Sequence, residues 1–280
     1  MINKKLILIA SAVLIVGVAS SVKSPSHPLV FYEERSFLDG INLAKSVQKP
    51  PYKIIGGIIP HHLAVGFIMA DFYSRLSWQK PSTIILIGPN HYEKGSFKTL
   101  TSLYGWQTPY GTVEPDEFII HALIKQNLAA IDEDTLTSDH AVAGSMSFVK
   151  YYIPNAKVVP ILLSGSLTEK ESEILADGVK GFVKQGAVII APVDFSHYLS
   201  NQQAKKNDEI TLQVIKDFNY HQLFLMNNDY LDSAPSIGVI LMVMQKLGIV
   251  RMDLLYHSNS GEIQKNDYIP TTSYFSIAFY

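Results

Sequence analysis

Three apolar segments of the sequence each run into a histidine. They are "GGIIPHH" (56–62), "LIGPNH" (86–91) and "IIAPVDFSH" (189–197). Uniformly apolar strands that alternate with helices are typical of a parallel sheet that is covered on both faces. In such sheets, ligands bind outside the carboxyl ends of the strands. We therefore expect His61, His91 and His197 at one rim of a parallel sheet.

The alternation of apolar and amphipathic segments begins at residue 53 and continues to the last residue. It predicts an α/β fold: a single three-layer αβα domain over residues 53–280, with a largely parallel central sheet. The strands are expected at 54–59, 83–87, 98–102, 157–163, 187–193, 251–256 and 273–279. The helices are expected at 63–77, 116–128, 143–152, 168–184, 202–218 and 235–247.

Composition excludes several classes of function. The formal net charge is −2 and the basic residues are scattered, which argues against a nucleic-acid partner. The sequence has no glycine-rich phosphate loop of the common nucleotide-binding types. It also has no cysteine, so disulfides, thiolate metal ligands and a cysteine nucleophile are excluded. We expect a small-molecule substrate as the partner, and no nucleic acid.

The first 52 residues differ in character from the rest. Residues 1–23 have two lysines, then an uncharged apolar run over 6–19, then small polar residues. This layout predicts a signal peptide cleaved after Ala19 or Ser20, or an uncleaved membrane anchor. We therefore expect an exported protein: periplasmic, extracellular or tethered to a membrane through residues 6–19. Residues 24–52 contain four prolines and little periodicity, and they are expected to form a linker.

Three convergent imidazoles are a donor set that suits a first-row transition metal. Pro60 precedes His61, and Gly88-Pro89 precedes His91, so the backbone is constrained where it leaves the sheet. Asp194 lies three residues before His197 and is a candidate second-shell partner for an imidazole. A single histidine at a strand end is usually a surface or capping residue, but three such histidines favour a metal site.

Other histidines have weaker arguments. His140, in "TSDHAVAG", is a candidate acid/base residue, but Asp139 and His140 also fit the start of the next helix. His62 is a candidate alternate ligand or wall of the site. The four remaining histidines carry no mechanistic argument; they are His27, His121, His221 and His257.

Several short motifs occur in the order of a known family. They are "PHHLAVG", "IGPNH", "WQTPYGTVEPDE", "SDHAVAGSMSFVKYYIPNAKVVPILLSG", "APVDFSHY" and "DSAPSIGVILMVMQKLG". Over residues 53–280 the chain resembles the Memo family, also called AmmeMemoRadiSam system protein B. That family is similar to the class III extradiol dioxygenases, which are αβα non-haem iron enzymes. The resemblance places the metal-site histidines at His61, His91 and His197, and candidate rim residues at Tyr110 and Asp116. The alternative for that loop is an ordinary turn capped by Asp116.

The chain departs from the family pattern at two positions. The family's Glu-His-Ser-x-Glu stretch is "DHAVA" here, so Ala143 replaces the second glutamate. Some members carry a cysteine where this chain has Asp232 and Ser233. Asp232 is a candidate hard oxygen ligand that favours Fe(II) or Mn(II) over Cu(I), or else an N-cap of the helix expected at 235–247.

The resemblance and the departures lead to one leading function and two alternatives. We expect a non-haem Fe(II) enzyme of extradiol-dioxygenase type with a catechol-like substrate. His140 or His197 would accept the proton of the diol. Cu, Zn and Mn remain alternative metals. A metal-dependent hydrolase would use the same ligands. A metal-binding or peptide-binding protein without catalysis is the alternative from another class, and the loss of the glutamate at Ala143 fits it.

Overall fold

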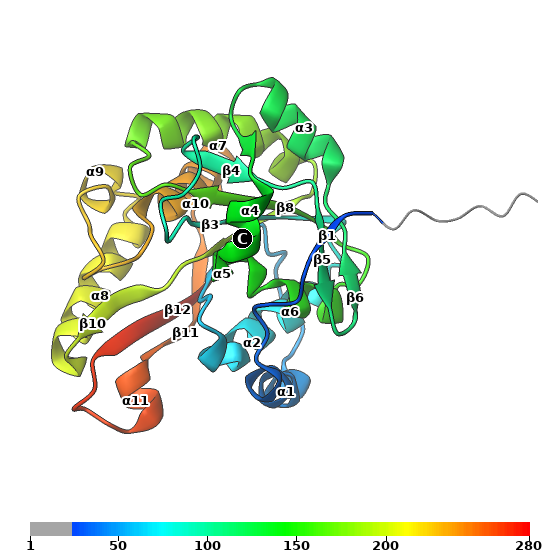
Figure 1. Cartoon of the computed structure of the whole chain (residues 1–280). Helices are drawn as coiled ribbons and strands as arrows, with labels where there is room; N and C mark the ends of the chain where they lie inside the picture. The colour runs from blue at the N-terminus through cyan, green and yellow to red at the C-terminus, as the bar shows by residue number, and fades with distance from the viewer. Residues whose placement is uncertain (1–23) are drawn as a thin grey trace, which may run out of the picture.

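A mixed sheet of nine strands forms the centre of the computed structural model, which describes residues 24–280 (Figure 1). The predicted leader at residues 1–23 lies outside the described residues. Four adjacent parallel strands make the middle of the sheet, in the order β2 (Gly56–Ile59), β9 (Val188–Pro192), β3 (Thr83–Pro89) and β8 (Lys157–Leu163). They confirm the prediction of a largely parallel α/β sheet.

Antiparallel strands extend both edges of this parallel centre. On the β2 side, β12 (Thr271–Phe279) pairs with β2, and both β10 (Phe195–Leu199) and β11 (Met252–Asn259) pair with β12. On the β8 side, β4 (Thr99–Thr101) pairs with β8, and β7 (Ala130–Ile131) runs parallel to β4. Because β2, β9 and β3 run parallel to one another, their carboxyl ends lie together at one rim.

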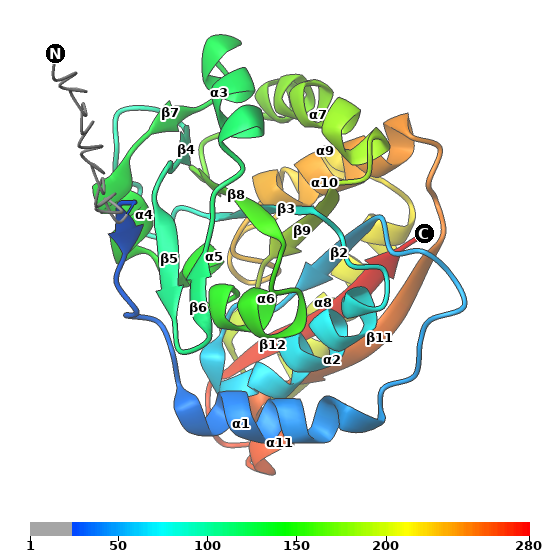
Figure 2. The ribbon, with the colours of Figure 1, turned by 90° about the vertical axis from the view of Figure 1, so that its right-hand side faces the viewer.

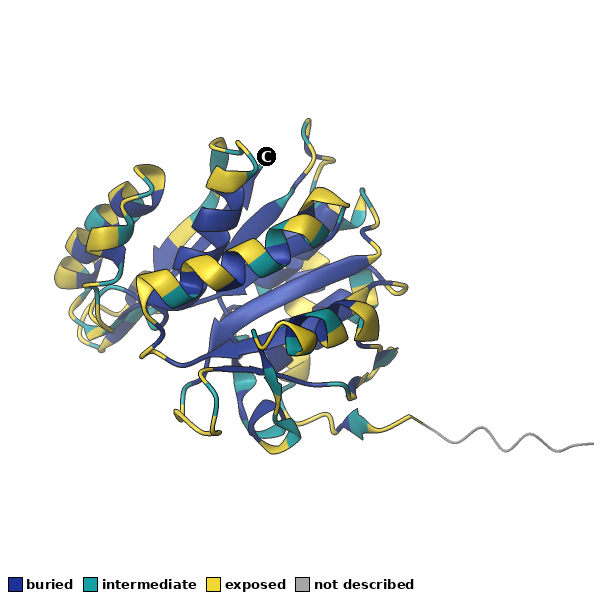
Figure 3. Ribbon diagram, turned by 90° about the horizontal axis from the view of Figure 1, so that it is seen from above, coloured by how far each residue is buried: buried dark blue, intermediate teal, exposed yellow. Residues whose placement is uncertain are grey.

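Side chains of the central strands alternate between two hydrophobic cores. Ile58 and Ile85 belong to one core, whereas their neighbours Ile59 and Ile84 belong to the other. The first core includes side chains of α3 (Glu117–Lys125), α7 (Glu169–Lys184), α8 (Asn201–Lys216) and α10 (Ala234–Lys246). The second includes side chains of α1 (Glu34–Leu43), α2 (Gly66–Ser77), α5 (His140–Ala143) and α6 (Met146–Tyr152). Figures 2 and 3 show these helices on both sides of the buried strands, as a three-layer fold requires.

Local signals in the sequence explain how several elements begin. Thr168 and Glu171 form the expected capping box at the start of α7. Pro235 lies in the first turn of α10, where a missing N–H costs nothing. Phe72 of α2 packs against Gly57, where an added Cβ would come within 2.1 Å of the Phe72 ring. Gly57 therefore allows α2 to lie directly on the sheet.

The segment 24–52 differs from the expected linker, because it forms structure and packs on the domain. It contains β1 (Ser26–His27), α1 and a 3₁₀ turn, η1 (Ala44–Ser46). His27 is buried, its ring lies 4.0 Å from that of Trp106, and its nitrogens hydrogen-bond Thr137 and Ser102 at 2.6 and 2.7 Å. Prolines at both ends of the segment mask the helical spacing of the buried residues of α1, which are Phe37, Gly40 and Ile41.

Two further segments differ from the prediction. The helix expected at 143–152 begins at Met146 as α6, and the separate short helix α5 ends before it at Ala143. The segment 105–113 forms a hairpin of β5 (Gly105–Thr108) and β6 (Gly111–Val113), and β1 pairs with β5. Shorter elements complete the fold: η2 (Leu63–Val65), α4 (Glu133–Ser138), α9 (Tyr220–Leu223) and α11 (Ser260–Gln264). Among residues 24–280, no helix combines the length and the apolar character needed to cross a bilayer.

Candidate metal centre

His61 follows β2 and is fixed by the neighbouring strand. Its backbone N–H donates to the Asp194 carboxylate at 3.1 Å, and its ring Nδ1 lies 3.1 Å from the carbonyl oxygen of Pro192. Because a carbonyl oxygen only accepts, Nδ1 carries the proton. The unprotonated Nε2 is therefore the atom that His61 presents as a metal ligand.

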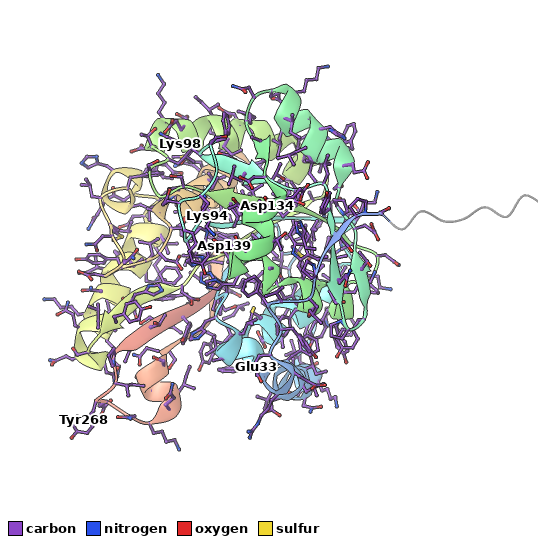
Figure 4. All side chains as sticks on the ribbon, viewed as in Figure 1. Glu33, Lys94, Lys98, Asp134, Asp139 and Tyr268 are labelled. Carbon is purple, nitrogen blue, oxygen red and sulfur yellow. The ribbon has the colours of Figure 1, made fainter. Side chains whose placement is uncertain are left out.

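His91 follows β3 and is held in the same tautomer by Asp139. The ring Nδ1 donates to Asp139 at 2.8 Å, and the backbone N–H of His91 donates to the second oxygen of the same carboxylate at 2.8 Å. Asp139 is fully buried between α4 and α5, near the middle of the view in Figure 4. This contact lowers the pKa of Asp139 against the effect of burial, and it leaves Nε2 of His91 available to a metal.

His140 is the first residue of α5, and Gly88 explains its closeness to His91. A Cβ at Gly88 would lie 2.9 Å from the Cβ of Ala141, so only glycine lets α5 rest on β3. The His140 ring stacks on that of His91, with 4.2 Å between ring centroids, and lies edge-on to His61 at 5.0 Å. One ring nitrogen from each of these three histidines lies within 4.8 Å of the others.

Asp232 lies among the imidazoles rather than at the end of a helix. Its Oδ2 is 3.4 Å from Nε2 of His61, 3.8 Å from Nε2 of His91 and 4.0 Å from Nε2 of His197. The N-cap of α10 is Ser233, whose hydroxyl accepts the backbone N–H of Ser236. The interpretation of Asp232 as that cap is therefore wrong, because the neighbouring residue fills the role.

His197 lies on β10, at the outer side of this cluster. The sequence grouped it with His61 and His91, whereas the three-histidine group in the structure contains His140 in its place. Its Nε2 faces Asp232, and in the described part of the chain its buried Nδ1 has no hydrogen-bond partner. The structure thus brings His197 near the cluster without fixing its ring by a hydrogen bond.

The two stacked histidines have opposite pKa shifts. Burial opposes a positive charge on His91, but its hydrogen bond to Asp139 and the nearby carboxylate of Asp232 outweigh burial and raise its pKa to about 9. Burial also acts on His140, and there the repulsion from His61 and His91 adds to it and lowers its pKa to about 4. Without metal at neutral pH, His91 is therefore the protonated imidazole and His140 is a neutral one.

The candidate wall and rim residues take different positions. Asp194 contacts His61 directly, and its backbone N–H donates to Asp232 at 3.3 Å. The ring of His62 is turned to Tyr274, whose hydroxyl lies 2.7 Å from Nδ1. Tyr110, between β5 and β6, packs against Phe37 and Tyr151 instead of the imidazoles. Asp116 is the N-cap of α3, as the alternative interpretation expected.

The donor set fits a divalent metal ion. Imidazole nitrogens about 2.1 Å from an ion lie at most about 4.2 Å apart, so the three rings need only a small closure to bind one. Oδ1 of Asp232 is buried without a hydrogen-bond partner among residues 24–280, and such an oxygen is costly unless a cation or a donor compensates it. A metal between these imidazoles and Asp232 would provide that compensation.

Sequence reasoning missed two contributors to this site. In the sequence Asp139 fits only the start of a helix, yet in the structure it holds both the ring and the backbone of His91. The adjacent pair Asp139-His140 contained no signal that Asp139 would contact a histidine 48 residues away. Phe31, in the supposed linker, lies 5.9 Å from the His140 ring. In the sequence, the only sign that Phe31 contributes to the site is that an aromatic residue lies in a segment bounded by prolines.

Fold and cluster together define a class of α/β protein in which imidazoles gather at the carboxyl ends of a parallel sheet. Comparison with known proteins gives the family. The model of the family described as Memo-like protein matches residues 25–277, so the chain belongs to the Memo family. A MEMO1 family protein of Pyrobaculum aerophilum is 28% identical over 283 residues, which cover 92% of this chain and 99% of the relative. One from Sulfurisphaera tokodaii is 29% identical with the same coverage.

The fold also matches a solved structure at low sequence identity. It is the crystal structure of an uncharacterized protein from Escherichia coli K12, with a TM-score of 0.52 and 11% identity. The match covers 78% of this chain and 98% of that protein. At this identity the likeness concerns the fold alone, and it agrees with the α/β architecture described above.

Proposed function

We propose that this protein is an exported, non-haem Fe(II)-dependent enzyme of extradiol-dioxygenase type. His61, His91 and Asp232 are the proposed ligands. The observation that carries the proposal is the position of Asp232, whose Oδ2 faces Nε2 of both histidines while its buried Oδ1 has no hydrogen-bond partner among the described residues. Two imidazoles and one carboxylate are the donor set of many non-haem Fe(II) oxygenases.

The bound metal would supply a Lewis acid with open positions for a diol and for O2. The chain's own residues prepare the proton transfer. Neutral His140 stacks on His91, and its lowered pKa keeps the ring unprotonated at neutral pH, as a group that receives a proton from a bound hydroxyl group must be. His197 is the second candidate, since its Nδ1 is not engaged with another described residue.

A cavity of about 650 Å³ lies beside the cluster, and it shares Asp232 with the cluster but none of the described imidazoles. Asp232 is among its lining residues, together with Asn227, Asn228 and the apolar side chains of Phe224 and Leu231. A size of this order is typical of pockets for small molecules. Among the described residues that line the cavity, two carry a carboxylate and none is basic, which favours a neutral diol over an anionic substrate.

The test is metal analysis of protein purified without oxygen, followed by anaerobic titration with Fe(II) and then with catechol. A stoichiometric metal, a charge-transfer band with catechol, and consumption of one O2 per diol would support the proposal. Metal binding with hydrolysis but no O2 uptake would favour the hydrolase. A chain that binds neither metal nor catechol would favour a binding protein without catalysis, as the replacement of glutamate by Ala143 also allows.

A further inference from the structure

The backbone around His197 is unusually constrained. Ser196 and Tyr198, on either side of it, have φ angles of +31° and +58°, a region that side chains other than glycine seldom occupy. The pairing of β10 with β12 also shifts register on both sides of His197. A strand with this conformation persists only where surrounding contacts hold it.

One of those contacts comes from a buried carboxylate on α8. Ser196 is fully buried, and its hydroxyl donates to Oδ1 of Asp208 at 2.7 Å. The other oxygen of Asp208 lies 2.8 Å from Nε2 of His257, whose ring stacks on Phe275 at 4.2 Å. The carboxylate thus joins β10 to α8 and β11, and both of its oxygens have partners.

The hydrogen bonds of the histidine rings show why the link between Ser196 and Asp208 matters for the metal centre. His61 and His91 are oriented by hydrogen bonds to Nδ1, whereas Nδ1 of His197 has no partner among residues 24–280. The direction of the His197 ring therefore depends on its backbone. Two backbone hydrogen bonds support that backbone, from Ser196 to Tyr230 and from His197 to Asn228.

We infer that Ser196 and Asp208 are positioning residues for His197: their buried hydrogen bond holds β10 in the strained form that points the imidazole at Asp232. The role in catalysis rests on the function proposed above, but the positioning itself does not. Loss of the Ser196 hydroxyl would leave the strain in place and remove its anchor. It would also leave one buried oxygen of Asp208 without a donor.

The test uses the metal-free full chain with isotope-labelled histidine, and it follows the ring NMR signals at one fixed pH. His197→Gln assigns the His197 signal. In Ser196→Ala we expect that signal to move or broaden several-fold more than in the control Ser172→Ala, while the signals of His61 and His91 stay in place. Ser172 is a matched control because it is equally buried and its hydroxyl has no hydrogen-bond partner in the described residues.

A second pair of variants covers the case in which Ser196→Ala unfolds. Asp208→Asn keeps one carbonyl oxygen for Ser196, so it should displace the His197 signal less than Asp208→Ala does. Ser196→Gly relieves the positive φ and should melt at a higher temperature than Ser196→Ala. A His197 signal that stays as in wild type in every folded variant overturns the inference. Failure of the wild type to bind metal would refute the proposed function instead, since these signals are read without metal.

Discussion

Asp139 holds His91 at two points, through the ring Nδ1 and through the backbone N–H, each at 2.8 Å. One buried carboxylate thus fixes both the tautomer and the place of a proposed metal ligand. Asp139 also accepts the backbone N–H of Ala141 and so caps α5. The strand that ends at His91 and the helix that begins at His140 are therefore joined by a single side chain.

The first prediction concerns this carboxylate. Asp139→Asn should lower affinity for a divalent metal about 10- to 100-fold, because the ring of His91 loses its charged partner. The fold should persist, since asparagine caps a helix about as well as aspartate. Isothermal titration with Co(II) measures the affinity. Asp132→Asn is the matched control, because Asp132 caps α4 in the same way and is not among the residues that contact the cluster; equal losses in both variants would contradict the prediction.

The second prediction tests the proposed ligands on the strand ends. His61→Ala and His91→Ala should each abolish stoichiometric metal binding and leave most of the stability, because these residues extend from the sheet rather than fill its core. Metal content after anaerobic Fe(II) loading is the measurement, together with a thermal melt. His121→Ala, on the exposed side of α3, serves as the control. Full metal content in both variants would show that the site is misplaced.

The third prediction separates a ligand from a helix cap at two neighbouring positions. Asp232→Asn should weaken Fe(II) binding strongly without lowering the melting temperature, since it removes a buried carboxylate. Ser233→Ala should do the reverse and cost about 1 kcal/mol of stability by loss of the cap. Asp232→Cys should shift preference toward softer metals such as Cu(I) or Zn(II). Unchanged affinity in both Asp232 variants, with loss in His140→Ala or His197→Ala, would transfer the third ligand to that histidine.

The fourth prediction concerns pH. A metal must displace the proton of His91, whose pKa is raised to about 9 in the metal-free protein, so apparent affinity should rise with pH up to that value. Below that pKa, the apparent metal affinity is expected to change about tenfold per pH unit from this group alone.

The same proton also affects the stability of the metal-free fold. Its contribution is fully present below pH 6.5 and disappears as pH rises from 6.5 to about 9. His140, with a pKa of about 4, adds nothing in this window. Titrations at several pH values would refute this if affinity were flat.

The fifth prediction concerns export. A fusion of residues 1–52 to a reporter that is active only outside the cytoplasm should be active, because the lysines and apolar run of residues 1–23 have the layout of an export signal. Replacing an apolar residue of the run with arginine should abolish the signal. A stably expressed but silent fusion would contradict the prediction.

The sequence predicted the parallel centre of the fold because each apolar strand is buried on both faces and so has a recognisable pattern. Its edges were harder to predict: β10 is short and irregular, and its pairing with β12 depends on a segment some 75 residues later. In the site, strand ends identified His61 and His91. Neither spacing nor composition could reveal that Asp139 would face His91, or that Ser233 would cap α10 and leave Asp232 to the imidazoles, because those contacts depend on tertiary packing.

The packing of the first described segment determines where this protein can be shortened. A fragment that began at residue 53 would expose the Trp106 ring now covered by His27 and remove Phe37 from its place against Phe148. It would also leave Ser102 and Glu133 without their buried imidazole partner. A fragment that keeps these contacts must therefore include the segment 24–52, and a fragment trimmed to the apolar strands alone should be prone to aggregate.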